Sequence, residues 1–274
     1  MDVLIVGAGA MGRWLGRVFG EATAVGGPDW SDRPCHVTYL DRQETVARDA
    51  VSATAATNTA ARSSLGDERF DVVCVAVPIP AVTAALAEHA PRARRAVVDV
   101  TGTMTGPVET MAEHAPECEH CSLHPLFAPA NEPGNVPMAV DSAGPVTAFL
   151  RDALEKRGNY VFETTPTEHD EYMKTVQARA HAAILAYGLA SDSVPDEFQT
   201  PVSRELSSLV EQVTSGNPRV YADIQAAFDG AEDVATMAAE LAGANRETFE
   251  SLYRRARFED TPTSAELDDR ENNS

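Results

Sequence analysis

Three glycines near the start of the chain have the spacing of a phosphate-binding loop. Gly7, Gly9 and Gly12 form a G-x-G-x-x-G pattern between residues 2–6, which are typical of a buried strand, and residues 13–19, which are typical of a helix. The first glycine would allow a tight turn, the second a close approach to a pyrophosphate, and the third packing of the helix on the strand. Free N–H groups at a helix N-terminus bind phosphates. The pattern therefore predicts a dinucleotide site.

An acidic residue follows the second expected strand, residues 36–40. At that position Asp41 could accept hydrogen bonds from ribose hydroxyls and would repel a 2′-phosphate, which favours NAD over NADP. Residues 21–34 form a loop insertion rich in Gly and Pro, which explains the long spacing from the glycine pattern. Two alternatives stay open, because Asp41 could be a turn residue and Arg42 could meet the 2′-phosphate of NADP.

Strand and helix patterns alternate through the first part of the chain. The expected strands that follow cover residues 70–77, 96–100, 122–124, 138–140 and 160–163, and the expected helices cover residues 81–89 and 106–113. This alternation predicts an α/β fold with a doubly wound, mostly parallel sheet of Rossmann type. Ligands of such sheets lie beyond the carboxyl ends of the strands. Residues 101–103 and His124 fall at such ends, and we expect Met11, Val77 and Pro78 to contact the cofactor.

The second part of the chain has a helical pattern. Thr165 and Pro166 predict a capped helix start, and the helix should extend to about residue 190. A polar stripe on it could face either solvent or the cofactor cleft, and consists of Asp170, Lys174, Gln177 and His181. His169 falls on the apolar side, which predicts a structural role. Further helices are expected over residues 202–213, 218–228 and 231–255.

These patterns predict three regions. Residues 1–164 should form the dinucleotide-binding Rossmann domain, and residues 165–258 an all-helical domain. Residues 259–274 are polar and acidic, which predicts a disordered tail.

The composition restricts the classes of partner. The 274 residues include 42 acidic and 22 basic side chains, which gives a net charge of −20, and the only lysines are Lys156 and Lys174. Such an excess of negative charge argues against nucleic acid or an anionic membrane as a partner. Because concentrated salt would screen the repulsion, we expect a halophilic protein. The sequence shows neither a signal peptide nor a run of about 18 apolar residues, and we expect a cytoplasmic location.

Four cysteines are present. Cys74 lies in an apolar segment and should be a core residue, and Cys35 stands alone. Cys118 and Cys121 form one C-x-x-C pair near several histidines, but a zinc site would need a second ligand pair at a suitable spacing. We therefore expect reduced thiols and assign no metal.

Six ordered segments resemble the prephenate/arogenate dehydrogenase family over nearly the whole chain except the tail. They are residues 7–12, Ala76-Val-Pro-Ile79, residues 99–107, His124-Pro-Leu-Phe-Ala-Pro129, His169-Asp170 with Gln177 and His181, and residues 216–224. The resemblance implies a Rossmann domain, a helical domain that forms a homodimer, and a small-molecule substrate. The implied reaction is NAD(P)-dependent oxidative decarboxylation of prephenate to 4-hydroxyphenylpyruvate, or of arogenate to tyrosine, in tyrosine biosynthesis.

The resemblance also implies roles for individual residues. His124 corresponds to the family's catalytic histidine, and a neutral imidazole can accept the substrate's hydroxyl proton near pH 7. His181 corresponds to a histidine near the substrate, and Gln177 lies on the same stripe. We assign both to the substrate site.

Two departures from the family pattern affect the site. The family usually has serine at the position of Gly102 and lysine at that of Met104, so Thr101 or Thr103 would have to supply the hydroxyl; we assign Thr103 to the catalytic set. The family also places an arginine, which holds a substrate carboxylate, where this chain has Gln212. A neutral amide cannot form that charged pair. Arg204 is the expected substitute anchor, ahead of Arg179 and Arg219.

These departures keep two other functions open. The chain could be a dehydrogenase of the same fold that acts on another hydroxy acid. It could also be a dinucleotide-binding sensor with weak or no activity. A site centred on a histidine favours an enzyme, whereas Gly102 and Gln212 together favour the sensor.

Overall fold

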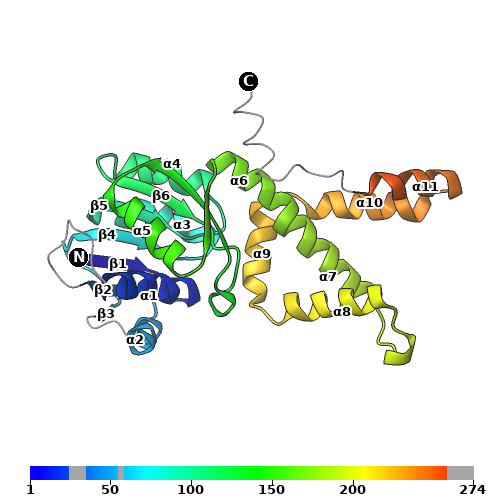
Figure 1. Ribbon diagram of the computed structural model, residues 1–274, viewed down its shortest axis with the longest axis horizontal. Helices are drawn as coiled ribbons and strands as arrows, with labels where there is room; N and C mark the ends of the chain where they lie inside the picture. The colour runs from blue at the N-terminus through cyan, green and yellow to red at the C-terminus, as the bar shows by residue number, and fades with distance from the viewer. Residues whose placement is uncertain (25–34, 55–58, 258–274) are drawn as a thin grey trace, which may run out of the picture.

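The computed structural model describes residues 1–24, 35–54 and 59–257, which form a sheet domain followed by a helical domain (Figure 1). The strands are β1 (Asp2–Val6), β2 (His36–Leu40), β3 (Thr59–Arg62), β4 (Phe70–Val75), β5 (Ala93–Asp99), β6 (Glu119–Leu123), β7 (Asn135–Ser142) and β8 (Tyr160–Glu163). The helices of the sheet domain are α1 (Ala10–Ala24), α2 (Glu44–Ala53), α3 (Val82–His89), α4 (Thr105–His114) and α5 (Pro145–Lys156). Those of the helical domain are α6 (Pro166–Met173), α7 (Ala180–Ala190), α8 (Pro201–Thr214), α9 (Pro218–Ala227), α10 (Ala231–Gly243) and α11 (Arg246–Arg255).

The sheet has the strand order of a Rossmann fold. Its eight described strands run β3-β2-β1-β4-β5-β6-β7-β8, and β1 through β6 are parallel. β7 is antiparallel to β6, and β8 is parallel to β7. Because the order reverses between β1 and β4, the crevice for a ligand lies beyond their carboxyl ends. The predicted fold class is therefore confirmed.

Each face of the sheet is covered by helices. Val3 and Ile5 of β1 face a core that includes side chains of α1 and α5, whereas Leu4 and Val6 face a second core with α3 and α4. This alternation follows the two-residue period of a strand. A central parallel strand is buried on both faces and so has a continuous apolar sequence.

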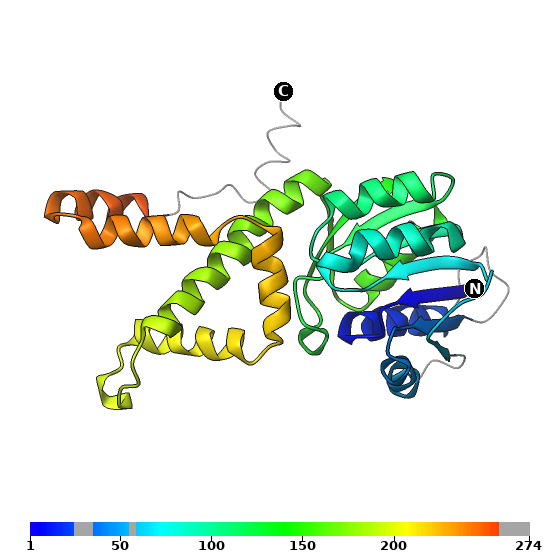
Figure 2. The ribbon, with the colours of Figure 1, turned by 180° about the vertical axis from the view of Figure 1, so that it is seen from behind.

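The helical domain has little core of its own. Four of its buried apolar residues, Met173, Ala178, Ile224 and Phe228, pack with Ile79 and Leu126 of the sheet domain. The views in Figures 1 and 2 agree that α10 and α11 extend away from the sheet. α7, α10 and α11 bury no residue within the described chain.

Several predicted elements differ from those observed. α1 extends to Ala24, so the first residues assigned to the loop insertion are helical, whereas residues 25–34 lie outside the described residues. The expected helix over residues 231–255 is two helices, because Asn245 caps α11 through Thr248 N–H. The capped start at Thr165 is confirmed, since its side chain accepts Glu168 N–H. The predicted tail, residues 259–274, lies outside the described residues.

The long helix that follows Thr165 contains a change of pitch. Residues Lys174–Arg179 form a π-helical turn between α6 and α7. Tyr172, beside this turn, and Val176, within it, are 60% and 54% exposed. No helix in the described part of the chain is long and apolar enough to cross a membrane.

Candidate active site

The glycine loop between β1 and α1 is shaped for close approach by a ligand. Gly7 has a φ of +94°, and a Cβ there would collide with the Ala76 carbonyl oxygen. A Cβ on Gly12 would collide with the Gly7 carbonyl oxygen, so the start of α1 packs tightly on the loop. At Gly9, by contrast, no heavy atom lies within 4 Å of the Cβ position. The loop therefore leaves room for a phosphate group beside the start of α1.

The Asp41 carboxylate lies beside this loop. Its Oδ2 accepts Ala8 N–H at 3.0 Å, and its Oδ1 accepts Gln43 N–H at 2.9 Å. A carboxylate has about four lone-pair positions, so further donors can still bind. Asp41 is partly buried and Arg42 is exposed. Val77 and Pro78 follow β4 at the same edge of the sheet, and Met11 is partly buried in the first turn of α1.

His124 follows β6 and contacts a second histidine. Its Nδ1 lies 2.9 Å from His169 Nε2, and His169 Nδ1 lies 2.9 Å from Asp170 Oδ1. His169 is therefore not simply part of an apolar face, as the sequence pattern predicts, but connects His124 to a carboxylate. The two carboxylate oxygens of Asp170 also accept N–H groups of Met104 and Thr105, at 2.9 and 3.0 Å.

The environment of these groups favours a neutral His124. Burial, followed by the proximity of His169, lowers the pKa of His124 to about 3, while Asp170 acts in the opposite direction. Burial raises the pKa of Asp170, but hydrogen bonds from His169 and Thr105 outweigh it, and the net pKa is below the ordinary value. Near pH 7 the site thus contains an uncharged imidazole and an ionised carboxylate.

The π-helical turn brings an amide to the free side of His124. Gln177 Nε2 lies 3.4 Å from His124 Nε2, while Gln177 Oε1 is buried without a hydrogen-bond partner in the described structure. His181, four residues later, has its ring 4.8 Å from that of Tyr221, and its buried Nδ1 also has no described partner. π-helical turns occur often at functional sites. These unpartnered polar atoms could bind a polar ligand.

The loop after β5 adds no hydroxyl to His124. A Cβ on Gly102 would lie 3.8 Å from His124 Nε2 and 3.1 Å from Ile79 Cδ1. The Thr103 side chain forms no hydrogen bond to His124 among the described residues, and its carbonyl accepts the Thr101 hydroxyl. Thr101 also donates to Asp99, a fully buried carboxyl at the end of β5.

The two residues expected to anchor a carboxylate lie on α8. Arg204 and Gln212 are both exposed, and neither side chain forms a hydrogen bond or ion pair with another described residue. The structure therefore does not bring them to His124 within this chain. Arg179, a weaker candidate, is paired with Asp233 at 2.6 Å.

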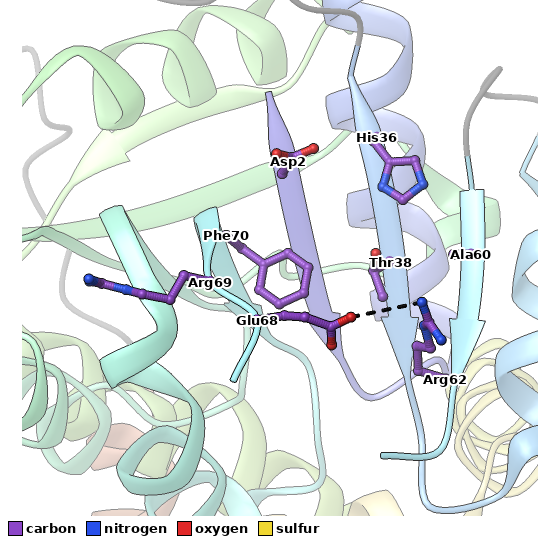
Figure 3. A pocket seen from close by; sticks show the side chains of 8 residues that line it. All are labelled: Asp2, His36, Thr38, Ala60, Arg62, Glu68, Arg69 and Phe70. Atoms are coloured by element: carbon purple, nitrogen blue, oxygen red, sulfur yellow. Dashed lines mark ion pairs between the residues drawn. The ribbon is translucent and has the colours of Figure 1, made fainter. Parts of the chain in front are cut away.

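A separate pocket lies at the other end of the sheet. It is lined by the first residues of three strands, Asp2, His36 and Phe70, and by Arg62 and Glu68, which form an ion pair at 3.9 Å (Figure 3). Asp2, His36 and Phe70 lie at the amino ends of β1, β2 and β4, whereas Arg62 is the last residue of β3 and its carbonyl accepts Asp41 N–H. The four cysteines are free and buried.

His169 and Asp170 are the site residues that sequence reasoning placed differently or left without a role. A His-Asp pair in the first turns of a helix was the available signal. Periodicity alone could not show that this helix start packs against the end of β6.

Comparison with known proteins identifies the family. Residues 32–138 match the family model described as prephenate dehydrogenase, nucleotide-binding domain. A 4-amino-4-deoxyprephenate dehydrogenase from Streptomyces pristinaespiralis is 31% identical, and the match covers 79% of this chain and 80% of that protein. A probable arogenate/prephenate dehydrogenase from Methanocaldococcus jannaschii is 27% identical over 58% of this chain, but the match covers only 39% of that protein.

Solved structures of low sequence identity share the fold. Prephenate dehydrogenase from A. aeolicus, in complex with hydroxyphenyl propionate and NAD⁺, has a TM-score of 0.63 at 16% identity, with 93% of this chain and 94% of that chain covered. Synechocystis arogenate dehydrogenase has a TM-score of 0.56 at 16% identity, with both chains fully covered. Together with the family model and the Streptomyces relative, they show that this chain belongs to the prephenate/arogenate dehydrogenase family of NAD(P)-dependent dehydrogenases.

Proposed function

We propose that the chain catalyses NAD-dependent oxidative decarboxylation of prephenate or arogenate. The observation that carries this proposal is a buried, neutral His124 at the carboxyl edge of the sheet, on the edge where the glycine loop also lies. Bound NAD⁺ supplies the hydride acceptor. The protein must then bind the substrate, take its hydroxyl proton and keep water away from the reacting carbon.

The cofactor would bind along the glycine loop. Gly7, Gly9 and Gly12 leave space for the pyrophosphate beside the start of α1, where N–H groups are free to donate. Asp41 would accept hydrogen bonds from the adenosine ribose, and its charge would disfavour a 2′-phosphate. This supports NAD over NADP, with Met11, Val77 and Pro78 as further contacts.

His124 would act as the base. Its Nε2 faces away from His169 and toward Gln177, which leaves this nitrogen to receive the hydroxyl proton of a bound substrate. A general base of this kind contributes about 10²–10⁴ in rate. Loss of carbon dioxide then makes the ring aromatic. Thr103 remains the proposed source of a hydroxyl when the substrate is bound, although its side chain forms no hydrogen bond to His124 in the described structure.

The substrate would be held by groups from the helical domain. Gln177 and His181 have buried polar atoms without described partners, so both can bind a polar substrate without breaking existing hydrogen bonds. Arg204 is our candidate for the carboxylate that survives the reaction, with the Gln212 amide as a weaker contact. Because both are exposed on α8, they would serve a site that α8 approaches when a second copy packs against it.

A homodimer through the helical domain is part of this proposal. Large apolar side chains are exposed along the helical domain, among them Leu189 at 89%, Phe198 at 78% and Tyr253 at 63%. Exposed apolar surface on this scale is typical of an interaction site. Sedimentation velocity should therefore give the mass of a dimer; a stable monomer would contradict this part of the proposal.

A second substrate is favoured by the Streptomyces relative, whose name specifies an amino group in place of the ring hydroxyl. An amine offers two N–H donors, and His124 Nε2 and Gln177 Oε1 could accept one each. The missing hydroxyl at Gly102 would then be less important.

The test is reduction of NAD and NADP with three substrates in concentrated KCl: prephenate, arogenate and 4-amino-4-deoxyprephenate. We expect turnover with prephenate or arogenate, with NAD preferred, and release of carbon dioxide in equal amount. Turnover only with the amino compound would select the second candidate. Binding of NAD without turnover of any of the three would favour the sensor function instead.

A further inference from the structure

Three polar side chains, His124, His169 and Asp170, form a continuous hydrogen-bonded row that ends at the edge of the helical domain. His124 and His169 are 9% and 2% exposed, whereas the Asp170 side chain is 23% exposed. Both ring nitrogens of His169 have protein partners, His124 Nδ1 on one side and Asp170 Oδ1 on the other. The row therefore has a defined direction, from the buried base to a carboxylate near solvent.

The hydrogens in this row can be assigned from its carboxylate end. Asp170 accepts N–H groups from Met104 and Thr105, and an ionised carboxylate can only accept. His169 must therefore carry its hydrogen on Nδ1 and donate it to Asp170. When His169 is neutral, its Nε2 has a lone pair, and the bond to His124 then requires a hydrogen on His124 Nδ1.

The same assignment leaves His124 Nε2 without a hydrogen. The Gln177 amide nitrogen, 3.4 Å from this atom, is placed as a donor to it. We propose that His169 and Asp170 are positioning residues that hold His124 in the tautomer with an unprotonated Nε2, the tautomer that can accept a proton there. The inference depends on the proposed function for the identity of the substrate, but not for the protonation state of His124.

The step that this arrangement supports is a single proton transfer. The O–H bond of the substrate breaks and an N–H bond forms at His124 Nε2, while the hydride leaves the adjacent ring carbon with both electrons of its C–H bond. His124 becomes an imidazolium that still donates from Nδ1 to His169. Asp170 does not take the proton, as in the triads where an aspartate orients a histidine. After the product leaves, the Nε2 proton passes to water.

The row also joins the two domains. Asp170 and His169 belong to α6, whereas Met104 and Thr105 lie at the start of α4 in the sheet domain. The Asp170 carboxylate accepts from both N–H groups only when α6 packs against α4. The tautomer of the base is thus fixed by the same contact that holds the domains together.

Asp170→Asn tests the assignment with almost no change in shape. With the new amide oxygen in the place of Oδ2, where it accepts Thr105 N–H, the NH₂ group takes the place of Oδ1, loses the bond from Met104 N–H and donates to His169 Nδ1. His169 would then carry its hydrogen on Nε2 and donate to His124 Nδ1. Each hydrogen bond in the row would then run in the opposite direction. His124 would carry its hydrogen on Nε2, and this nitrogen could not accept a proton from the substrate.

The primary measurement is nitrogen NMR of isotopically labelled imidazoles in the full chain near neutral pH, with His124→Asn used to assign the signals. In the wild type, His124 should be protonated on Nδ1; in Asp170→Asn it should be protonated on Nε2. With the active substrate, Asp170→Asn should lower kcat at least ~10²-fold and leave NAD affinity unchanged. Glu171→Gln, a neighbouring exposed carboxylate paired with Lys174, is the matched control and should retain wild-type kcat.

The outcomes separate this inference from the proposed function. Protonation of wild-type His124 on Nε2 would overturn the inference, as would wild-type kcat in a folded Asp170→Asn variant whose His124 is protonated on Nε2. If Asp170→Asn does not fold, the tautomer of His124 in the wild type still tests the inference. Absence of turnover with all three substrates, together with the expected tautomers, would instead reject the proposed function alone.

Discussion

Gly102 determines which groups surround the free nitrogen of His124. A side chain at this position would start 3.8 Å from His124 Nε2 and would touch only the flexible end of Ile79. The φ angle of Gly102 lies outside the left-handed region that favours glycine. The backbone therefore accepts a serine here, and the absence of a hydroxyl is a property of the sequence rather than of the fold.

Gly102→Ser should raise kcat with prephenate. A new hydroxyl could hydrogen-bond both the base and the reacting group, and a hydrogen bond to a charged group contributes about 1.5–3 kcal/mol, which corresponds to about tenfold or more in rate. Steady-state kinetics would measure the effect. Gly102→Ala is the control, because it adds the same Cβ without the hydroxyl. Equal kcat values for the two variants would show that no catalytic hydrogen bond forms.

At the scale of elements, the strands were the most predictable part of the chain. β1 and β2 match the predicted segments because strands buried on both faces need unbroken apolar sequence. The edge strand β3 and the helices α2 and α5 were missed, although α5 begins with Pro145 and buries Leu150 and Leu154. The π-helical turn has no sequence signal of its own, since tertiary contacts decide where a helix changes pitch.

The candidate site was predictable in outline only. His124, Gln177 and the glycine loop were identified from motifs, and the structure brings His124 and Gln177 together. The contact between His169 and His124 was not predictable, because it depends on how the helical domain packs on the sheet. Arg204 and Gln212 lie on a helix that packs beside α7, and spacing along that helix cannot place either residue relative to the base.

The end of β5 contributes a pH-dependent term to stability. Burial, opposed by hydrogen bonds from Ser122 and Thr101, raises the pKa of Asp99 from 3.8 to about 7. Between these values the folded protein keeps a proton that the unfolded chain has lost. The free energy of unfolding should therefore fall as the pH rises from about 4 to about 7.

Asp99→Asn removes this titration. The melting temperature of the variant minus that of the wild type should increase as the pH is raised through that range. The prediction concerns this increase and not the size of the difference at pH 4. Thermal unfolding at a series of pH values would measure it. Asp67→Asn, at an exposed site, is the control variant. A difference that does not change with pH for Asp99→Asn would mean that Asp99 is already ionised in the folded protein.

For the whole molecule, charge and exposed apolar surface are the dominant features. A net charge of −20 on 274 residues creates strong repulsion. The helical domain meanwhile exposes apolar side chains from several helices, such as Met237 and Leu241 of α10 and Phe249 of α11. Salt would favour the folded assembly in two ways, by screening the charges and by strengthening apolar association when the anion is strongly excluded.

The melting temperature should consequently rise steeply with KCl. The Debye length falls from about 10 Å at 0.1 M to about 3 Å at 1 M, so most of the gain should occur over this range. Scanning calorimetry in KCl, repeated in an equally concentrated solution of an uncharged osmolyte, separates screening from exclusion. A flat profile in KCl would contradict the halophilic interpretation of the composition.

The central claim is that His124 accepts the substrate proton in an NAD-dependent dehydrogenase reaction. The most direct test is the rate of NADH formation with prephenate in molar KCl, for the wild type and for His124→Asn, with NAD affinity measured by titration for both. The wild type should turn over, and His124→Asn should lose about 10²–10⁴ in kcat with unchanged NAD affinity. A His124→Asn variant that keeps the wild-type kcat would contradict the claim.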